Sequence, residues 1–401
     1  MATELSGIAA VGLIPKESPA SLKKGGKPIT LGMPKETSTE EKRVVLSPEA
    51  VRILSQNGIE VLVETQAGER AKFSDQQFSD AGAKIAYSSK EVFAADVVVK
   101  VNAPTEEEIA DMSSGACLIS ALQLEKQESR YIQALNTKKI TALAFEYLED
   151  KVGGMPVVRA MSEIAGSTVM LIASEYLSSV NEGKGLILGG ITGVPPTQVV
   201  IIGAGTVAEY AARTALGLGA NIKVFDNHLY KLRRIKQLLG QQIATSTIDN
   251  ASLSQALAEA DVVIGALRAE KGRNKIVITE EMVAKMIPGS VVIDVGIDQG
   301  GCIETARMTT HENPVYRTHD VIHYCVPNIP SLVSKTSSLA ISNLITSFVL
   351  KTGKTGGIEE MLWQGKSFMK GVYCYKGHVT HPLIGKLFKK AVKDIQLLLM
   401  N

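Results

Sequence analysis

A glycine-rich turn near the middle of the chain limits the possible folds more than any other feature. Residues 197–202 (TQVVII) form an apolar run typical of a buried strand, and they lead directly into Gly203-Ala204-Gly205-Thr206-Val207-Ala208, a G-x-G-x-x-A pattern. Asp226 ends the next expected strand, about 20 residues further on, where a ribose-binding acid has to lie. Together these features predict a dinucleotide-binding α/β unit.

Each residue of this turn has a physical role in holding a dinucleotide. Gly203 permits the tight turn, Gly205 lets the backbone approach a pyrophosphate, and Ala208 is small enough for the helix to pack on the strand. The phosphates would lie at the helix N-terminus, against Thr206 and Val207, where unpaired N–H groups and the helix dipole favour anions. The turn therefore predicts the phosphate site.

Asp226 predicts which dinucleotide binds. Its carboxylate can accept hydrogen bonds from both ribose hydroxyls, but it would repel a 2′-phosphate. The next residues are Asn227, His228 and Leu229, so no arginine follows immediately to receive that phosphate. We therefore expect the cofactor to be NAD rather than NADP.

Strand and helix patterns alternate on both sides of the turn, so the whole chain is predicted to be of the α/β class. Its 401 residues suggest two or three domains at roughly 150 residues each. In the first half, strands are expected at 29–33, 59–63, 95–101, 117–120 and 140–145, with a helix at 48–56 capped by Ser47. In the second half, strands at 199–202, 222–225, 262–266, 291–295 and 321–326, with a weaker one near 242–245, predict a doubly wound parallel sheet.

Two long helices and a short tail complete the expected layout. One amphipathic helix is expected from Arg159 to Asn181, and another from about residue 335 to Lys351. Residues 371–399 are too few for a third domain. We expect this tail to return to the first part of the chain.

The composition narrows the class of protein further. The chain is 45% hydrophobic and 21% charged with a formal net charge of +2, so no strong field points to nucleic acid or a membrane surface. The first residues lack the basic and apolar regions of a signal peptide, and residues 1–27 are expected to form a flexible extension. No apolar run reaches the ~18 residues of a membrane span. The four cysteines are far apart, which favours unpaired thiols and offers no metal-ligand spacing. We expect a cytoplasmic protein without a bound metal or direct membrane insertion.

Several separated motifs resemble those of one family. They are residues 32–36 (GMPKE), 41–48 (EKRVVLSP), 161–166 (MSEIAG), the turn at 203–208, 298–302 (DQGGC), and 324–330 (YCVPNIP) with 335–337 (KTS). In order and spacing they are similar to the alanine dehydrogenase/transhydrogenase α-subunit family, from about residue 29 to 350. The resemblance implies two Rossmann-like doubly wound domains, in which an NAD-binding domain (158–333) is inserted into a discontinuous catalytic domain (28–157 and 334–401).

The functional residues of the family correspond to single positions of this chain. The resemblance implies that Arg43 grips a substrate carboxylate, which suits its fork of parallel N–H donors, and that Asp298 is the active-site aspartate. Taken singly, Arg43 could equally form a surface ion pair and Asp298 could cap a loop. The resemblance also implies NAD contacts from the side chains of Ser162, Asp226, Lys231, Arg307 and Asn328 and from the main chain around Leu267 and Ile297.

Two catalytic residues of alanine dehydrogenases are replaced in this chain. The family lysine of a K-V-K-x-P motif corresponds to Asn102, and the family histidine of an L-H-L stretch corresponds to Gln123. Amides donate and accept hydrogen bonds, but they cannot take a proton near neutral pH. Lys100, two residues before Asn102, is expected on the same strand face and could partly replace the missing lysine. Otherwise it is a strand-end lysine that faces solvent.

Three functions are compatible with these residues. The leading hypothesis is an NAD-dependent homo-oligomeric enzyme that converts L-alanine, a small-molecule substrate, to pyruvate and ammonia, with Asp298 positioning water or ammonia. The second is the NAD(H)-binding α subunit of a proton-translocating transhydrogenase, because residues 99–104 (VKVNAP) are very similar to that subunit. Residues 152–156, however, lack the arginine, glutamine and aspartate of that subunit. The third is an NAD-binding protein with impaired catalysis.

Overall fold

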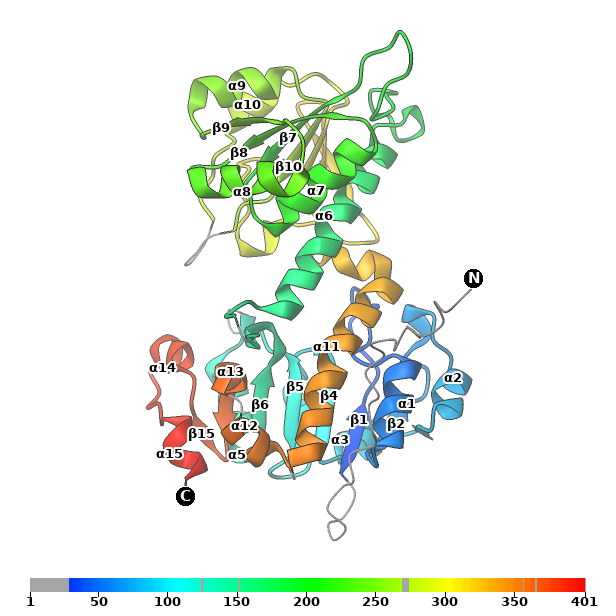
Figure 1. Cartoon of the computed structure of the whole chain (residues 1–401), viewed down its shortest axis with the longest axis vertical. Coiled ribbons are helices and arrows are strands. Elements are labelled where there is room, and N and C mark those ends of the chain that lie inside the picture. Colours follow the sequence, from blue (N-terminus) through cyan, green and yellow to red (C-terminus); the bar gives the residue numbers. More distant parts are fainter. Residues whose placement is uncertain are drawn as a thin grey trace, which may run out of the picture.

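Two β-sheets, each with helices packed on both faces, make up the protein (Figure 1). The computed structural model describes residues 29–123, 126–150, 152–268, 274–355, 357–364 and 366–400. The predicted fold class, α/β with two doubly wound units, is therefore confirmed. The flexible extension expected at residues 1–27 lies outside the described residues.

The first sheet combines strands from both ends of the chain. In the described residues its eight strands are β1 (Thr30–Met33), β2 (Glu60–Glu64), β3 (Lys84–Ala86), β4 (Val97–Asn102), β5 (Cys117–Ala121), β6 (Thr141–Ala144), β14 (Val372–Tyr375) and β15 (His378–Val379). They lie in the order β15-β14-β6-β5-β4-β1-β2-β3. The strands from β6 to β3 are parallel, whereas β14 runs antiparallel to β6 and β15. The tail of the chain thus extends the sheet that β1 begins.

The second sheet is built from the middle of the chain. Its seven described strands are β7 (Gln198–Ile202), β8 (Asn221–Phe225), β9 (Ala244–Ser246), β10 (Val262–Gly265), β11 (Val291–Asp294), β12 (Val315–Thr318) and β13 (Val321–Tyr324). They lie in the order β12-β13-β11-β10-β7-β8-β9, and β12 is antiparallel to β13. The sequence did not predict β12 or β3, because each is only three or four residues long and neither forms an apolar run.

Both faces of the first sheet are buried, which explains the nearly continuous apolar runs in its strands. Val97, Val99 and Val101 of β4 belong to one hydrophobic core, whereas Val98 belongs to the core on the opposite face. The second sheet likewise separates two cores. The four cysteines are buried and are free thiols, as predicted.

The helices cover the two sheets and connect them. In the described residues they are α1 (Pro48–Gln56), α2 (Asp75–Asp80), α3 (Ser89–Phe93), α4 (Glu106–Asp111), α5 (Ser129–Thr137), α6 (Pro156–Tyr176), α7 (Thr206–Gly217), α8 (Leu229–Leu239), α9 (Asn250–Ala258), α10 (Glu280–Ala284), α11 (Ser334–Thr355), α12 (Ile358–Gln364), α13 (Lys366–Met369), α14 (Pro382–Phe388) and α15 (Ile395–Leu399). The helix expected at 48–56 is confirmed, and the Ser47 side chain accepts a hydrogen bond from the Ala50 N–H as its N-cap.

Two long helices, α6 and α11, run between the two sheets (Figure 1). The bounds predicted for the first of them, Arg159 to Asn181, were wrong at both ends. The helix begins at Pro156, whose fixed φ suits the first helical position, and it ends at Tyr176 before a separate 3₁₀ turn. Gly166 brings α6 close to α7, since a Cβ at this position would lie 2.4 Å from the Val207 carbonyl oxygen.

One described helix, α6, is long and apolar enough to cross a membrane by length and composition alone. The core helix of a folded protein can have the same composition. Here Val169, Met170 and Ala173 of α6 are buried in the core of the second sheet.

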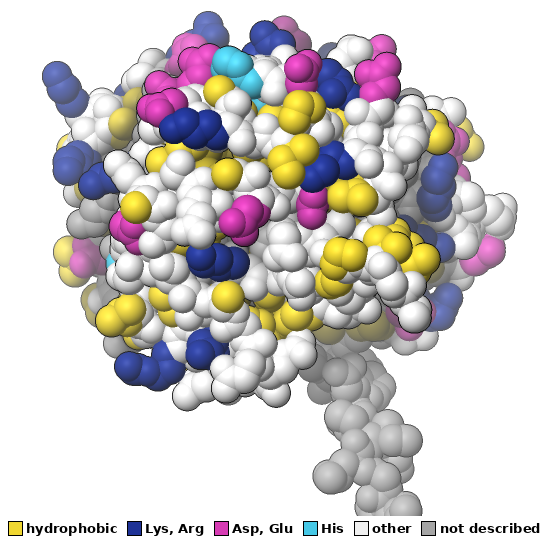
Figure 2. Space-filling model, turned by 90° about the horizontal axis from the view of Figure 1, so that it is seen from above, with side chains coloured by type: hydrophobic (Ala, Val, Ile, Leu, Met, Phe, Trp, Pro, Cys, Tyr) yellow, Lys and Arg dark blue, Asp and Glu magenta, His cyan; other side chains and the backbone are white. Residues whose placement is uncertain are grey.

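Positive and negative side chains are mixed on the surface, as the nearly equal numbers of basic and acidic residues in the sequence suggest. Seen from the end of the molecule that carries the second sheet, lysine and arginine are interspersed with aspartate and glutamate (Figure 2). Apolar side chains lie between them in small groups.

Candidate active site

The residues predicted to hold a dinucleotide lie along one edge of the second sheet. Gly203 follows β7, Asp226 follows β8, Leu267 follows β10, Ile297 follows β11, and Asn328 comes shortly after β13. Because these strands are parallel, their carboxyl ends meet at the same edge, where ligands bind in open α/β sheets.

The glycine turn has the geometry that a phosphate site requires. Gly203 has a φ of +106°, and a Cβ there would lie 2.6 Å from the Ala266 carbonyl oxygen, so a larger residue would clash with the backbone. Gly205 is the N-cap of α7, and nothing described lies within 4 Å of the place where its Cβ would be. The first N–H groups of α7, including those of Thr206 and Val207, have no partner within the helix. Open space in front of these donors fits a pyrophosphate.

Asp226 is held in place by the turn that it faces. It is only 3% exposed, and its Oδ2 accepts a hydrogen bond from the Ala204 N–H at 2.8 Å. Its Oδ1 accepts from the His228 N–H at 2.8 Å and lies 3.0 Å from His228 Nδ1. A carboxylate has about four lone-pair sites, so Asp226 retains capacity for a ribose hydroxyl. Its charge and position fit the adenosine ribose of a dinucleotide.

Three other expected cofactor residues make contacts close to their own positions in the chain. The Ser162 hydroxyl donates to the Val158 carbonyl oxygen on α6, as helical serines often do. Lys231 Nζ lies 5.9 Å from the ring centroid of Tyr230, and the Arg307 guanidinium lies 4.2 Å from that of Tyr316. Their contacts with a cofactor stay predictions.

Arg43 is buried and forms a two-pronged ion pair with Glu41. Arg43 Nε donates to Glu41 Oε1 at 2.7 Å, and Nη2 donates to Oε2 at 2.6 Å. The Glu41 side chain is fully buried, which would raise its pKa, but the guanidinium and further N–H donors outweigh burial and lower the pKa below its usual value. The pair is therefore charged at neutral pH.

The ion pair leaves part of the Arg43 guanidinium free for a ligand. A guanidinium has five N–H donors, and Glu41 uses one on Nε and one on Nη2. Nη1 lies 3.3 Å from the Met161 sulfur, which is a weak acceptor. The Nη1–Nη2 fork can therefore still grip a carboxylate with two parallel hydrogen bonds.

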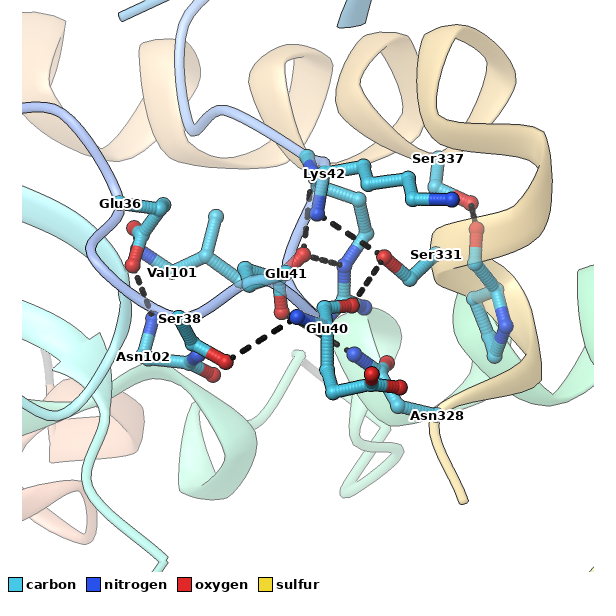
Figure 3. Close-up of polar contacts among 12 residues, drawn as sticks. Glu36, Ser38, Glu40, Glu41, Lys42, Val101, Asn102, Asn328, Ser331 and Ser337 are labelled. Atoms are coloured by element: carbon cyan, nitrogen blue, oxygen red, sulfur yellow. Dashed lines mark hydrogen bonds and ion pairs between the residues drawn. The ribbon is translucent and has the colours of Figure 1, made fainter. Parts of the chain in front are cut away.

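The loop that carries this ion pair joins the two sheets (Figure 3). Asn328 Nδ2 donates to Glu41 Oε2 at 3.1 Å, and the Lys42 N–H donates to the Ser331 hydroxyl at 2.9 Å. The Ser331 hydroxyl donates in turn to the Glu40 carbonyl oxygen at 2.8 Å. Asn328, which is expected to contact NAD, thus also forms a hydrogen bond with Glu41, the residue that orients Arg43. This bond connects the loop that follows β1 of the first sheet with the segment that follows β13 of the second.

A second group of polar residues lies at the carboxyl edge of the first sheet. Glu36 follows β1, Asn102 ends β4, Gln123 follows β5, and Glu146 follows β6. These strands are parallel neighbours, so the four residues lie along one edge. The Gln123 N–H donates to Glu146 Oε1 at 2.8 Å, which fixes the turn in which Gln123 has a φ of +47°. The two amides that replace the family lysine and histidine are therefore on the same edge.

Glu36 is the carboxylate next to Asn102. Glu36 Oε1 accepts from the Val101 N–H at 2.6 Å, and Oε2 accepts from the backbone N–H of Asn102 at 3.4 Å (Figure 3). Lys100 Nζ is 3.3 Å from Glu36 Oε2. Burial raises the pKa of Glu36 to about 7, although the Lys100 charge and the hydrogen bonds lower it and Glu41 adds a further increase.

The partial replacement of the family lysine by Lys100 stays a prediction. Val97, Val99 and Val101 of β4 share one core and Val98 lies in the core on the other face, so the strand alternates up to Val101. A register shift follows, because Val99 pairs with Ile119 and Asn102 pairs with Ala121. The alternative, that Lys100 is a strand-end lysine facing solvent, was wrong. Its side chain is 2% exposed, with Nζ 3.4 Å from Glu108 Oε2 as well as close to Glu36.

Asp298 is exposed in the 3₁₀ turn η5 (Ile297–Gln299), one residue after the buried Ile297. The loop around it is organised by Asp294, whose carboxylate accepts from the Gly296 N–H at 3.0 Å and the Cys302 N–H at 2.8 Å. Burial raises the pKa of Asp294 to about 6, and the charge of Asp298 contributes to this increase. The role of Asp298 in catalysis stays a prediction.

Sequence reasoning missed Glu36, Glu41 and Glu146 as members of the site. Glu36 and Glu41 lie inside two of the motifs that carried the resemblance, and Glu146 follows an expected strand, so each had a signal. What the sequence did not contain was the burial of Glu36 and Glu41 beside Asn102 and Arg43, and the contact of the half-buried Glu146 with the main chain of Gln123.

Comparisons with known proteins agree with this geometry. The model "Alanine dehydrogenase/PNT, N-terminal domain" matches residues 32–165, and "Alanine dehydrogenase/PNT, C-terminal domain" matches residues 169–382. Alanine dehydrogenase of Bacillus subtilis (strain 168) is 37% identical over 89% of this chain and 94% of its own length. A solved L-alanine dehydrogenase has a TM-score of 0.85 at 35% identity, covering 90% of this chain and 99% of its own. A transhydrogenase from Sinorhizobium meliloti has a TM-score of 0.75 at 25% identity, covering 88% and 99%.

Proposed function

This chain belongs to the alanine dehydrogenase/PNT family, and from that premise we propose that it is an NAD-dependent alanine dehydrogenase. The reaction converts L-alanine, NAD and water to pyruvate, ammonia and NADH. The observation that carries the proposal is the buried Arg43–Glu41 pair, because it presents one fork of a fixed guanidinium to a small carboxylate. The curated relatives named alanine dehydrogenase support the same substrate class.

The roles of the chain's own residues follow from their positions. Arg43 would hold the alanine carboxylate, and Glu41 would keep its guanidinium in one orientation. Gly203, Gly205 and the N-terminus of α7 would hold the pyrophosphate of NAD, and Asp226 would hold its ribose. When bound, NAD supplies the hydride acceptor. Asp298 would position the water that attacks C2.

The wider organisation of the enzyme is part of the same proposal. We place the NAD-binding domain at residues 158–333 and the catalytic domain at 28–157 and 334–401. The enzyme would act as a cytoplasmic homo-oligomer on a small amino acid and its 2-oxo acid. A structure in which residues 340–401 pack on the second sheet in the assembled oligomer would contradict this layout.

One observation favours a second function, the NAD(H)-binding subunit of a transhydrogenase. Residues 99–104 (VKVNAP) place an amide where alanine dehydrogenases have a lysine, and hydride transfer between two nicotinamides needs no proton carrier there. The solved transhydrogenase is less similar than the solved L-alanine dehydrogenase, by both TM-score and identity. We therefore rank this function second.

A direct assay separates the two functions. Purified protein is mixed with NAD and L-alanine, and NADH is followed by its absorbance, with D-alanine as the matched control. Alanine dehydrogenase activity gives NADH with L-alanine only, and the reverse reaction consumes NADH when pyruvate and ammonium are added. No turnover with either substrate pair would reject the proposal.

We expect NAD to bind at least tenfold more tightly than NADP, a difference of about 1.4 kcal/mol. The reason is that the buried carboxylate of Asp226 accepts hydrogen bonds from a ribose but repels a 2′-phosphate. Titration of the protein with NADH and NADPH, followed by the quenching of protein fluorescence, measures both affinities. Equal dissociation constants would show that Asp226 only holds the turn.

The change Arg43→Lys should raise the KM for pyruvate about 10- to 100-fold while the Kd for NADH stays the same. Lysine keeps a positive charge beside the buried Glu41, but it lacks the planar fork that grips a carboxylate. Steady-state reductive amination gives the KM, and NADH titration gives the Kd. An unchanged KM would assign Arg43 a purely structural role.

A further inference from the structure

The proposed reaction needs a group that can take and return a proton, and neither amide can do so. Asn102 and Gln123 occupy the places of the family lysine and histidine. In the described structure the backbone N–H of Asn102 donates to an ionisable side chain, Glu36, at 3.4 Å from Oε2. This carboxylate lies on the β1–α1 loop that also carries Arg43, the residue expected to bind substrate.

The contacts of Glu36 differ from those of an ordinary structural carboxylate. It is 6% exposed, and in the described structure it faces a strongly buried lysine, Lys100, on one side. Lys100 in turn lies 3.4 Å from Glu108, which holds it from the N-terminal turn of α4. The ammonium of Lys100 thus lies between two carboxylates, that of Glu36 after β1 and that of Glu108 on α4. The charged groups around Glu36 are Lys100 from β4, Glu108 from α4 and Glu41 from its own loop.

We propose that Glu36 carries the substrate proton in place of the missing family lysine and histidine, with Lys100 as the residue that positions it. This inference rests on the proposed alanine dehydrogenase function. Its carboxylate lies against the main chain of Asn102, on the same loop as Arg43 and along the same sheet edge as Gln123. One water between Glu36 and the substrate nitrogen would complete the path.

Glu36 takes one proton from the substrate and returns it before the products leave. The Glu36 carboxylate accepts one proton from the ammonium of alanine, and the freed nitrogen lone pair forms the C=N bond as hydride leaves C2 for NAD. Water then adds to C2 and releases one proton to solvent, which is the net proton of the reaction. Protonated Glu36 returns its proton to the amino nitrogen, the C–N bond breaks as the C2 hydroxyl becomes the carbonyl of pyruvate, and the hydroxyl proton leaves with ammonia as ammonium. Glu36 ends as it began.

The protonation equilibrium of Glu36 agrees with this role. A proton carrier works best when its pKa lies near the operating pH. Burial raises the pKa of Glu36 to about 7, and Lys100 limits the increase. In the oxidative direction the ionised form is active, so kcat/KM for alanine should rise with pH through about 7.

The test compares the pH profiles of wild type and Glu36→Gln, which has the same shape but cannot ionise. We expect kcat/KM to fall about 10²- to 10⁴-fold in Glu36→Gln and the rise near pH 7 to disappear. Lys100→Met should move the rise to higher pH, because the charge that lowers the pKa of Glu36 is removed. Glu108→Gln is the matched control, since it removes a carboxylate from Lys100 but leaves Glu36 beside Asn102, and it should keep the rise.

A second measurement does not depend on turnover. Infrared difference spectra of the protein without ligands, between pH 5.5 and 8.5, should contain a protonated-carboxyl band that titrates near 7. The component that titrates near 7 should be missing in Glu36→Gln and present in Glu108→Gln, whereas Asp294, with a pKa of about 6, should contribute its own component in all three proteins. A Glu36→Gln protein that keeps the wild-type rate and pH profile overturns this inference and leaves the proposed function intact.

The remaining outcomes are also decisive. If Glu36→Gln does not fold, the wild-type profile decides, and a kcat/KM without an ionisation near pH 7 overturns the inference. A wild-type protein that makes no NADH from alanine at any pH overturns the proposed function, and the catalytic role of Glu36 with it, even where the infrared band is present.

Discussion

The variant Glu41→Ala is expected to lose about 3–5 kcal/mol of its free energy of unfolding. Glu41 is fully buried, and its two oxygens accept from three N–H donors of Arg43, two on the guanidinium and one on the backbone, and from the side-chain amide of Asn328. Removing it leaves a buried guanidinium without its counter-charge, which costs far more than the loss of an exposed ion pair. The variant should also lose one hydrogen bond between the two sheets, because Asn328, the partner of Glu41, follows β13 of the second sheet.

Urea unfolding followed by circular dichroism measures this loss, and the chain offers a matched control. Glu49 pairs with Arg52 at 2.6 Å on α1, but both side chains are at least half exposed. Glu49→Ala should therefore change the free energy of unfolding by no more than about 1 kcal/mol. If the two variants lost the same amount, the Arg43–Glu41 pair would be as solvated as the surface pair.

The same pair predicts how stability depends on pH. The pKa of Glu41 is lower in the folded protein than its ordinary value of 4.5, despite burial, because Arg43 and other donors stabilise the ionised form. A depressed carboxylate pKa stabilises the fold at any pH above the unfolded value, and this contribution disappears as the pH falls through the folded value. Glu41→Ala should thus lose less additional stability on acidification below pH 4.5 than wild type does.

The sequence predicted those parts of the site that are formed by residues close together in the chain. The turn at Gly203 and the acid at Asp226 follow strands at a fixed spacing, and the positive φ at position 203 is one that glycine adopts readily. The helix cap at Ser47 is equally local, since its partner is the Ala50 N–H three residues away. Such features can be read from one stretch of sequence.

The parts that could not be predicted depend on contacts between distant segments. The sequence did not show that Lys100 is buried between Glu36 and Glu108, because these two carboxylates come from the β1–α1 loop and from α4. The burial of Glu41 depends on Asn328, which comes from the other sheet. The sequence shows that a carboxylate and a guanidinium are two residues apart, but not that each is the other's partner in a buried site.

Restoring both family residues, with Asn102→Lys and Gln123→His, should raise the rate of pyruvate reductive amination about 10²-fold. General acid–base catalysis contributes about 10²- to 10⁴-fold, and we expect the lower end because Glu36 already carries part of the proton transfer. Both positions lie on the carboxyl edge of the first sheet, at the ends of the neighbouring strands β4 and β5, so the new side chains would enter the same site.

The increase should require both changes, because groups that act as a unit are not additive. Steady-state rates with saturating NADH and ammonium measure it, and each single variant should remain within about tenfold of wild type. Asn102→Met with Gln123→His is the control that fills the lysine site without an ionisable group, and it should gain little.

The new ammonium would lie close to Glu36 and lower its pKa, so the active double variant should also reach its maximal oxidative rate at a lower pH than wild type. A wild-type turnover that already reaches about 10 s⁻¹, with no increase in the double variant, would show that Glu36 and its neighbours fully replace the family pair.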